Sequence, residues 1–287
     1  MPQRLKEREV ESAAMESTGV YWIPAADLLE ANGTEVVLVD AREARMVPGR
    51  KSDVRDCQWL QKLHSCGLPR GAFRPPEAVA AVRSIPREKD NLTAMRTQAI
   101  RRMRKSLDRM NIRVHQAVSD IDGKTGTAII QAIAEGERDP VKLAALRDRR
   151  CKKSEKEIAD HLTGTWRDGH LFNLGQAFKT LQFLDERTAG YDAKAARMFA
   201  SLAPSAGTSG NPSPPPDKKP AAKKRSDVAG KNSILRFLGI DITAIPGIGY
   251  DTAAVIASEL GSDFSRFPNE RGFASYIGLA PPLGKSA

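Results

Sequence analysis

The stretch DNLTAMRTQAIRRMRKSLDRMNIRV, residues 90–114, carries apolar side chains at steps of three and four residues. This first stripe consists of Leu92, Met95, Ala99, Met103, Leu107, Met110 and Val114. Such spacing keeps the side chains on one face of an α-helix. Its mean of about 3.67 residues is closer to an 11-residue repeat than to a heptad. The stretch therefore predicts a long and nearly straight helix.

A second apolar stripe follows about 60 residues later and completes a helical region that we expect to span residues 77–203. Its members are Leu174, Phe178, Leu181, Leu184, Tyr191, Ala195, Met198 and Leu202. The two stripes predict an antiparallel hairpin or a coiled coil, formed within one chain or with a partner chain. An ordinary helical core is the alternative interpretation.

Basic side chains occupy the other faces of the first helix. Residues 83–113 hold 10 basic and 3 acidic side chains, so most of the net charge of +10 carried by the 287-residue chain lies in this segment. The basic residues along the first stripe are Arg96, Arg101, Arg102, Arg104, Lys105, Arg109 and Arg113. Such a stripe favours contact with a nucleic-acid backbone, for which we select Arg101, Arg102 and Lys105. A solvated basic surface is the alternative.

The N-terminal part of the chain predicts an α/β segment over residues 15–76. We expect helices at 21–31 and 53–63, and a short buried strand at 35–39. Residues 1–15 show no strand pattern and predict a charged, poorly structured lead. One strand and two helices cannot close a sheet by themselves.

Three carboxylates in this segment predict a metal site. Glu16 lies in Met-Glu-Ser-Thr-Gly (15–19), and Asp53 and Asp56 lie in Gly-Arg-Lys-Ser-Asp-Val-Arg-Asp (49–56). A spacing of three residues puts Asp53 and Asp56 on one face of a helix. Mg²⁺ prefers such oxygen ligands and completes its shell with substrate phosphates. Lys51 and Arg55, interleaved with the aspartates, are candidates to hold those phosphates.

The last third of the chain divides into a linker and a compact end. Residues 204–231 hold six prolines and a run of lysines, and this composition predicts a basic tether. Residues 232–287 predict a helix at 250–260, stopped by Gly261, and a second helix near 270–277. Gly247 and Gly249 lead into the first of these, where backbone N–H groups at a helix N-terminus suit a phosphate. A plain turn is the alternative.

Cysteine usage and the lack of long apolar runs indicate the compartment of the protein. The three cysteines are odd in number and widely spaced, so we expect a reducing compartment and no zinc site. No apolar run approaches the roughly 20 residues of a membrane span, and the N-terminus has no apolar signal core. The sequence predicts a cytoplasmic protein with no membrane partner.

Three blocks of sequence, in order, resemble the DEDD-type insertion-sequence transposases, the group of the Piv DNA invertase and the bridge-RNA-guided recombinases. The blocks are Met-Glu-Ser-Thr-Gly-Val-Tyr-Trp (15–22), Val-Pro-Gly-Arg-Lys-Ser-Asp-Val-Arg-Asp-Cys-Gln-Trp-Leu (47–60) and the segment from Ile-Pro-Gly-Ile-Gly to Gly-Leu-Ala-Pro (245–281). The resemblance runs from about residue 15 to the last residue.

This resemblance implies an architecture and a chemistry. It implies a partial RuvC-like (ribonuclease H type) domain at 1–76, a helical coiled-coil region at 77–203, a linker at 204–231 and a C-terminal transposase domain at 232–287 with a helix-hairpin-helix-like motif. It also implies that Glu16, Asp53 and Asp56 hold Mg²⁺ and that Ser286 is the nucleophile. DNA, a structured guide RNA and further copies of the chain are the implied partners.

The sequence departs from the family pattern at two places. Residues 1–15 hold no aspartate to supply the first acidic ligand, and Ser286 is followed only by Ala287. We therefore expect a copy truncated at both ends. Two functions follow: a transposase that cuts and rejoins DNA, or a catalytically dead nucleic-acid-binding remnant of one. A metal-dependent nuclease of the Holliday-junction type, which needs the carboxylates but not Ser286, is a weaker third hypothesis.

Overall fold

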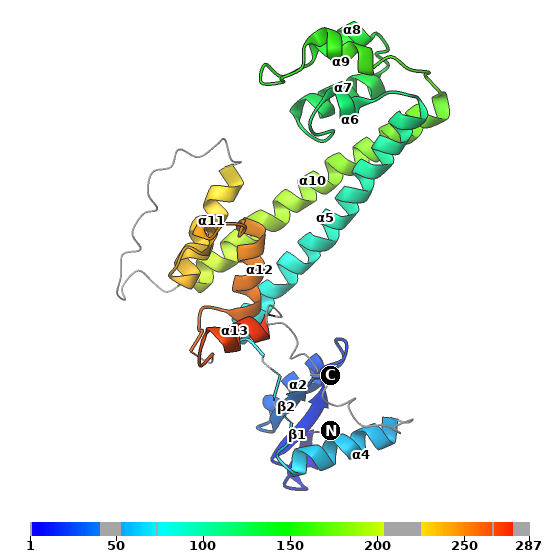
Figure 1. Cartoon of the computed structure of the whole chain (residues 1–287). Coiled ribbons are helices and arrows are strands. Elements are labelled where there is room, and N and C mark those ends of the chain that lie inside the picture. The colour runs from blue at the N-terminus through cyan, green and yellow to red at the C-terminus, as the bar shows by residue number, and fades with distance from the viewer. Residues whose placement is uncertain are drawn as a thin grey trace, which may run out of the picture. The chain divides into compact units, whose positions relative to one another are not determined.

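The structure, a computed structural model, describes residues 2–40, 53–69, 71–72, 74–203, 225–265 and 267–277; for 225–229 it describes the backbone alone. These residues form two compact units, Met1–Pro75 and Pro76–Ala287. Over the described part, the chain is mostly helical with one small parallel sheet. Figure 1 shows the elements in chain order.

The first unit contains a two-stranded parallel sheet with helices around it. The strands are β1 (Ser12–Glu16) and β2 (Glu35–Val39), paired so that Ser12 faces Glu35 and Glu16 faces Val39. Helix α1 (Pro2–Lys6) precedes β1, α2 (Trp22–Glu30) connects the strands, and α4 (Asp53–Ser65) follows. The expected helices and the strand at 35–39 are confirmed. Gly33, with a φ of +83°, lies in the turn that ends α2.

The expectation that residues 1–15 form a poorly structured lead with no strand is wrong, because these residues include α1 and most of β1. Ser-Ala-Ala-Met-Glu has no β-branched residue and no alternation of polar and apolar side chains, so its composition gives no strand signal. Pairing decides the conformation instead. The Glu35 N–H donates to the Glu11 carbonyl at 2.9 Å, and the Ser17 N–H donates to the Val39 carbonyl at 3.0 Å. The valine-rich β2 thus imposes an extended conformation on its neighbour.

The second unit is built on two long helices, α5 (Glu77–Arg109) and α10 (Asp168–Leu202), which pack along each other. Lys89 faces Asp192 and Arg96 faces Asp185, so residue numbers rise along α5 as they fall along α10. The predicted antiparallel hairpin is confirmed within one chain. Most of both stripes is buried, but Met95 is 54% exposed and does not belong to the first stripe.

Four short helices fill the connection between α5 and α10 and form a cluster at one end of the hairpin (Figure 1). They are α6 (Val114–Ala117), α7 (Lys124–Glu135), α8 (Pro140–Ala145) and α9 (Glu155–His161). Their apolar side chains join those of the hairpin in one core, which includes Met103, Ile129, Ile130, Leu143 and Ile158. This end of the hairpin is therefore anchored by a continuous apolar core.

The other end of the hairpin packs against two C-terminal helices, α11 (Arg225–Leu238) and α12 (Tyr250–Leu260). The short 3₁₀ turn η1 (Ile242–Ala244) precedes α12, and α13 (Glu270–Tyr276) follows it. Phe199 of α10 and Phe237 of α11 lie with ring centroids 5.4 Å apart in a second core. The predicted helices at 250–260 and near 270–277 are confirmed, and Gly261 ends α12 with a φ of +77°.

The linker expected at 204–231 differs from the structure at its C-terminal end. Residues 204–224 lie outside the described part of the chain, and residues 225–231 belong to α11. The reason is packing: Gly230, Ile234, Phe237 and Leu238 share the buried face of α11, with Gly230 against the ring of Tyr250. This contact extends the helix into a segment whose composition alone predicts a tether.

Lys89 joins three helices, and we expect its replacement to destabilise the second unit. Its side chain is only 14% exposed, and its ammonium group pairs with Asp192 at 2.5 Å and also with Asp251 of α12. Burial alone lowers the pKa of Lys89, but Asp192 and Asp251 outweigh it and raise the pKa above the usual 10.5. Lys89→Met should lower the free energy of unfolding by roughly 1–3 kcal/mol. This loss is smaller than the loss expected on breaking a fully buried ion pair, because Asp251 is exposed.

The pH dependence gives this prediction a second check. A cation whose pKa is raised by folding stabilises the fold fully below its unfolded pKa, and this contribution is lost as pH rises through the folded value. Urea unfolding at pH 7, 9 and 11 should show the difference between wild type and Lys89→Met shrinking above the ordinary pKa of 10.5. A constant difference at all three pH values would contradict the assignment. Lys194→Met, at an exposed position, is the matched control.

Two helical glycines should respond to alanine with opposite signs. A Cβ at Gly126 in α7 would press against the carbonyl oxygens of Ile121 and Asp120, the latter at 2.7 Å, whereas a Cβ at Gly190 in α10 would meet nothing within 4 Å. We expect Gly126→Ala to destabilise by about 1–3 kcal/mol. Gly190→Ala should stabilise by about 0.5–1 kcal/mol through helix propensity. Thermal denaturation of the two variants tests the packing of α7; a stabilised Gly126→Ala would refute it.

Candidate functional site

Glu16 is the last residue of β1 and lies at the carboxyl end of this strand. Its side chain is half-buried, and its Oε1 accepts a hydrogen bond from the Thr18 hydroxyl at 2.6 Å. Gly19 then turns the chain with a φ of +67°, and its carbonyl accepts from the Trp22 indole at 3.1 Å. The carboxyl end of a parallel strand is the edge where α/β proteins bind ligands. Glu16 therefore has a position suited to a functional carboxylate.

Asp53 and Asp56 lie in the first turn of α4. Asp53 is exposed and Asp56 is half-buried, and Arg55 between them is exposed. The other end of α4 contacts β1, because His64 Nε2 lies 2.8 Å from the Ser12 hydroxyl. Carboxylates at a helix N-terminus interact favourably with the helix dipole. Lys51, the other predicted phosphate ligand, lies outside the described residues.

The described structure does not bring the three predicted metal ligands into one cluster. Among the residues it describes, no group of three or more His, Cys, Asp and Glu side chains is arranged to hold a metal ion. Residues 41–52, which join β2 to α4, are outside that part of the chain. Glu16, Asp53 and Asp56 nevertheless all belong to the first unit, two of them at helix α4 and one at strand β1.

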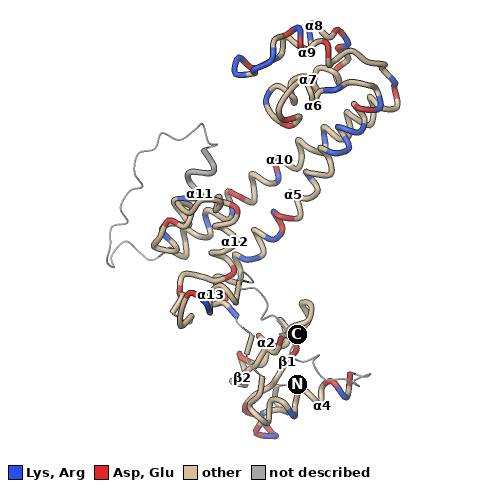
Figure 2. Tube along the Cα trace, viewed as in Figure 1, with Lys and Arg blue, Asp and Glu red and all other residues tan. Residues whose placement is uncertain are grey.

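A basic groove lies between the two long helices near the α6–α9 cluster. Its volume is about 280 Å³, and Arg102, Lys105 and Arg109 of α5 line one side of it. On the α10 side, the lining residues include Asn173, Gln176 and Thr180. Figure 2 shows Lys and Arg gathered along this part of α5. Cations together with neutral hydrogen-bonding side chains are the groups that contact a phosphate backbone.

The structure changes the basic set inferred from the sequence. Arg101 is exposed but does not line the groove, whereas Arg109 does. Steps of three and four residues from Arg102 to Lys105 and Arg109 would have indicated this face. Arg96 is a structural residue instead: its guanidinium pairs with Asp122 at 2.8 Å and Asp185 at 2.6 Å. Burial lowers its pKa, but the two aspartates outweigh burial and raise it.

The glycine turn before α12 has the geometry of a helix start. Gly247 has a φ of +92°, which favours glycine, and Gly249 is the extended N-cap residue. The first turn of α12 already holds the Asp251 carboxylate, which pairs with Lys89. A negative charge of the chain itself thus occupies the positive end of the helix dipole. Ser286, the predicted nucleophile, lies outside the described residues.

Sequence reasoning missed an ion-pair cluster that joins three helices of the second unit. Lys89, Asp192 and Asp251 come from three helices separated by up to 162 positions in the chain. Each is an ordinary charged residue within a helical pattern, so no local signal marks the contact.

In the described residues, no helix is both long and apolar enough to cross a membrane.

Comparison with protein families places both ends of the chain in one group. A family model described as DEDD transposase of the IS110 type matches residues 3–112, from α1 through the end of α5. A second, described as transposase of the IS116/IS110/IS902 family, matches residues 241–287. No individually curated protein matches the chain. The two matches agree with each other and contain every candidate carboxylate and glycine, so the chain belongs to the IS110 family of DEDD transposases.

Proposed function

We propose that the chain cuts and rejoins DNA through carboxylate-bound Mg²⁺ and a serine nucleophile. Membership of the family supports transposase function and implies DNA as a partner. The observation that carries the chemical proposal is the position of Glu16 at the carboxyl end of a parallel strand. Asp53 and Asp56 occupy one helix end within the same family match.

The donor chemistry of these three residues fits a divalent cation. Family members generally use divalent metal ions, and three carboxylates without histidine or thiolate favour a hard cation such as Mg²⁺. A bound cation of this kind neutralises charge that develops on a phosphate during its transfer. Lys51 and Arg55 would bind the phosphate oxygens beside it. Because Lys89 neutralises the Asp251 carboxylate in the first turn of α12, Gly247 and Gly249 would still present backbone N–H groups to a second phosphate.

Ser286 would perform the covalent step. Its Oγ attacks phosphorus, a P–O bond to one deoxyribose breaks, and the released sugar hydroxyl takes a proton while Oγ loses one. The DNA end is then held as a phosphoserine ester. Attack by the hydroxyl of another DNA end reverses the step and restores the serine. The energy of the phosphodiester bond is retained, so no nucleotide cofactor is needed.

This proposal also assigns the parts of the chain. Residues 1–76 would form a RuvC-like domain, 77–203 the coiled-coil region and 204–224 the linker, and the C-terminal transposase domain would begin with α11 at Arg225. A structured guide RNA would select the target by base pairing, and a homo-oligomer would hold the DNA ends together.

A nucleic-acid-binding protein without DNA chemistry is the second candidate. The groove lined by Arg102, Lys105 and Arg109 supports it, because this surface requires neither a metal ion nor Ser286. Binding in EDTA without any joined product in Mg²⁺ would favour this candidate.

The test is a joining assay with the full chain. The substrates are DNA that carries the parent element with its flanks and RNA transcribed from the same element. We expect recombinant junctions, detected by sequencing, with Mg²⁺ and wild-type protein only. Ser286→Ala should give none, and Ser275→Ala in α13 is the matched control. Junction formation by Ser286→Ala at the wild-type rate would refute the serine mechanism.

A further inference from the structure

The connection between α8 and α9 is a strongly basic loop at the α6–α9 end of the hairpin. Residues 147–156 hold six basic and two acidic side chains. We call residues 147–154 the tip loop; it lies between Leu146, which caps α8, and the first residue of α9. Figure 2 shows Lys and Arg concentrated along it. Repulsion among these like charges opposes a compact loop, so specific contacts must hold the loop in place.

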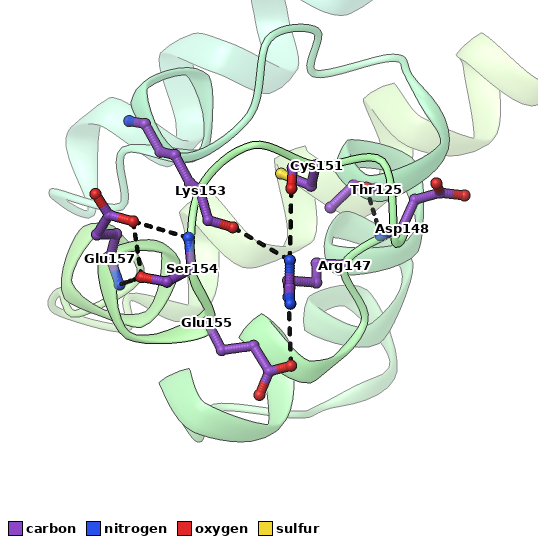
Figure 3. Close-up of polar contacts among 8 residues, drawn as sticks. All are labelled: Thr125, Arg147, Asp148, Cys151, Lys153, Ser154, Glu155 and Glu157. Carbon is purple, nitrogen blue, oxygen red and sulfur yellow. Dashed lines mark hydrogen bonds and ion pairs between the residues drawn. The ribbon is translucent and has the colours of Figure 1, made fainter.

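Arg147 fixes the loop from inside. Its side chain is 31% exposed, and Nη1 donates to the carbonyl oxygens of Cys151 and Lys153, both at 3.4 Å. Its Nε pairs with Glu155 Oε1 at 3.3 Å (Figure 3). One planar guanidinium thus ties both halves of the loop to the start of α9, which a flexible ammonium group does less well.

Both ends of the loop are fixed as well. The Asp148 N–H donates to the Thr125 hydroxyl of α7 at 3.0 Å, and the Asp148 carboxylate accepts from Lys124 at 2.8 Å and from Arg150. These bonds, that of Lys124 first, hold the pKa of Asp148 far below its usual range. At the other end, Ser154 and Glu157 form a reciprocal capping box that starts α9 (Figure 3).

Of the four other basic side chains of this region, Lys153 donates to the Gln116 carbonyl and the remaining three are exposed. Arg149, Lys152 and Lys156 are exposed, and no carboxylate of the described residues pairs with any of them. These three residues form what we call the surface triple. Residues 147–156 contain no aromatic side chain that could stack on a base. Fixed cations without aromatic neighbours fit the phosphate oxygens of a nucleic-acid backbone, which they would bind without reading sequence.

We propose that the tip loop, together with Lys156 in the first turn of α9, is a preorganised phosphate-binding surface, a nucleic-acid contact separate from the groove on α5. The inference rests on the proposed function in that it takes nucleic acid as the partner. Arg147 is a positioning residue, and the surface triple makes the contact. Because the loop is already ordered by Arg147, Asp148 and the capping box, binding requires little additional ordering of the backbone.

The test is binding of the full chain, in EDTA, to two fluorescein-labelled probes of mixed sequence: a DNA duplex and an RNA hairpin. Fluorescence anisotropy over a series of salt concentrations gives Kd and its salt dependence. Changing the surface triple to Gln should weaken binding at least about tenfold and make the negative slope of log K against log salt less steep by about 2 to 3. The control triple, Lys142, Lys194 and Arg197 to Gln, removes the same charge at exposed sites elsewhere.

Arg147→Lys tests whether binding depends on the ordered position of the loop or only on its net charge. It keeps the net charge, so a purely electrostatic attraction would leave affinity unchanged; we expect weaker binding and faster amide exchange at residues 149–153. Weakening by the surface triple supports the inference, with the affected probe identifying DNA, RNA or their shared backbone as ligand. Equal binding by the surface and control triples overturns the inference and leaves the proposed function intact. No binding of either probe by wild type overturns both.

Discussion

Asp53→Asn is expected to lower the rate of DNA joining by more than about 100-fold, since even the outer-shell partners of metal ligands typically contribute 10–100-fold. The amide keeps the shape of the carboxylate but removes its negative charge, so Mg²⁺ binds weakly and is misplaced. Glu16→Gln and Asp56→Asn should have the same effect. The measurement is the rate of junction formation at saturating Mg²⁺.

Two controls make this result specific. Binding to duplex DNA in EDTA should be unchanged in all three variants, because no metal is present and the basic surfaces are intact. Glu35→Gln, an exposed carboxylate at the start of β2, should join DNA at the wild-type rate. Near-normal joining by any of the three site variants would remove that residue from the metal site.

Neutralising the groove should weaken nucleic-acid binding without affecting the fold. Changing Arg102, Lys105 and Arg109 to Gln removes three cations that line one surface. If each contacts one phosphate, the negative slope of log K against log salt becomes less steep by about 2.7, which corresponds to a loss of roughly 100-fold or more in affinity at 0.1 M salt. Anisotropy titrations of duplex DNA measure both quantities.

The comparison with Arg101 makes this prediction sharper. Arg101→Gln removes a neighbouring exposed charge outside the groove, so it should reduce affinity much less than any single groove substitution. The control triple of Lys142, Lys194 and Arg197 should also leave the salt slope near the wild-type value. If the groove triple behaves like the control triple, the groove is not a nucleic-acid site.

The helical parts of the fold could be predicted because their signals are local. The stripes on α5 and α10, the stop at Gly261 and the valines of β2 each depend on residues close together in sequence. Strand β1 could not be predicted, because its conformation comes from pairing with a segment more than twenty positions away. The start of α11 was missed for a similar reason, since Gly230 packs against Tyr250.

The candidate sites also differ in how far the sequence alone predicts them. Identity, spacing and the family resemblance select Glu16, Asp53 and Asp56 as a donor set, and this set stays a prediction because the described structure does not bring the three side chains into one cluster. The groove, however, depends on Asn173, Gln176 and Thr180, which meet the α5 cations only when the hairpin forms. The pairing of Arg96 with Asp122 and Asp185 shows the opposite case, in which tertiary contacts remove a cation from the binding surface.

Mapping the covalent DNA–protein link by mass spectrometry tests the central claim most directly. The joining reaction is stopped by denaturation, the DNA is digested, and the protein is cleaved after glutamate, so that residues 271–287 form one peptide. We predict a phosphodeoxynucleotide on Ser286, formed only with Mg²⁺ and lost in Asp53→Asn. A modification at Ser275 instead, or DNA joining with no modified peptide, would contradict the proposed chemistry.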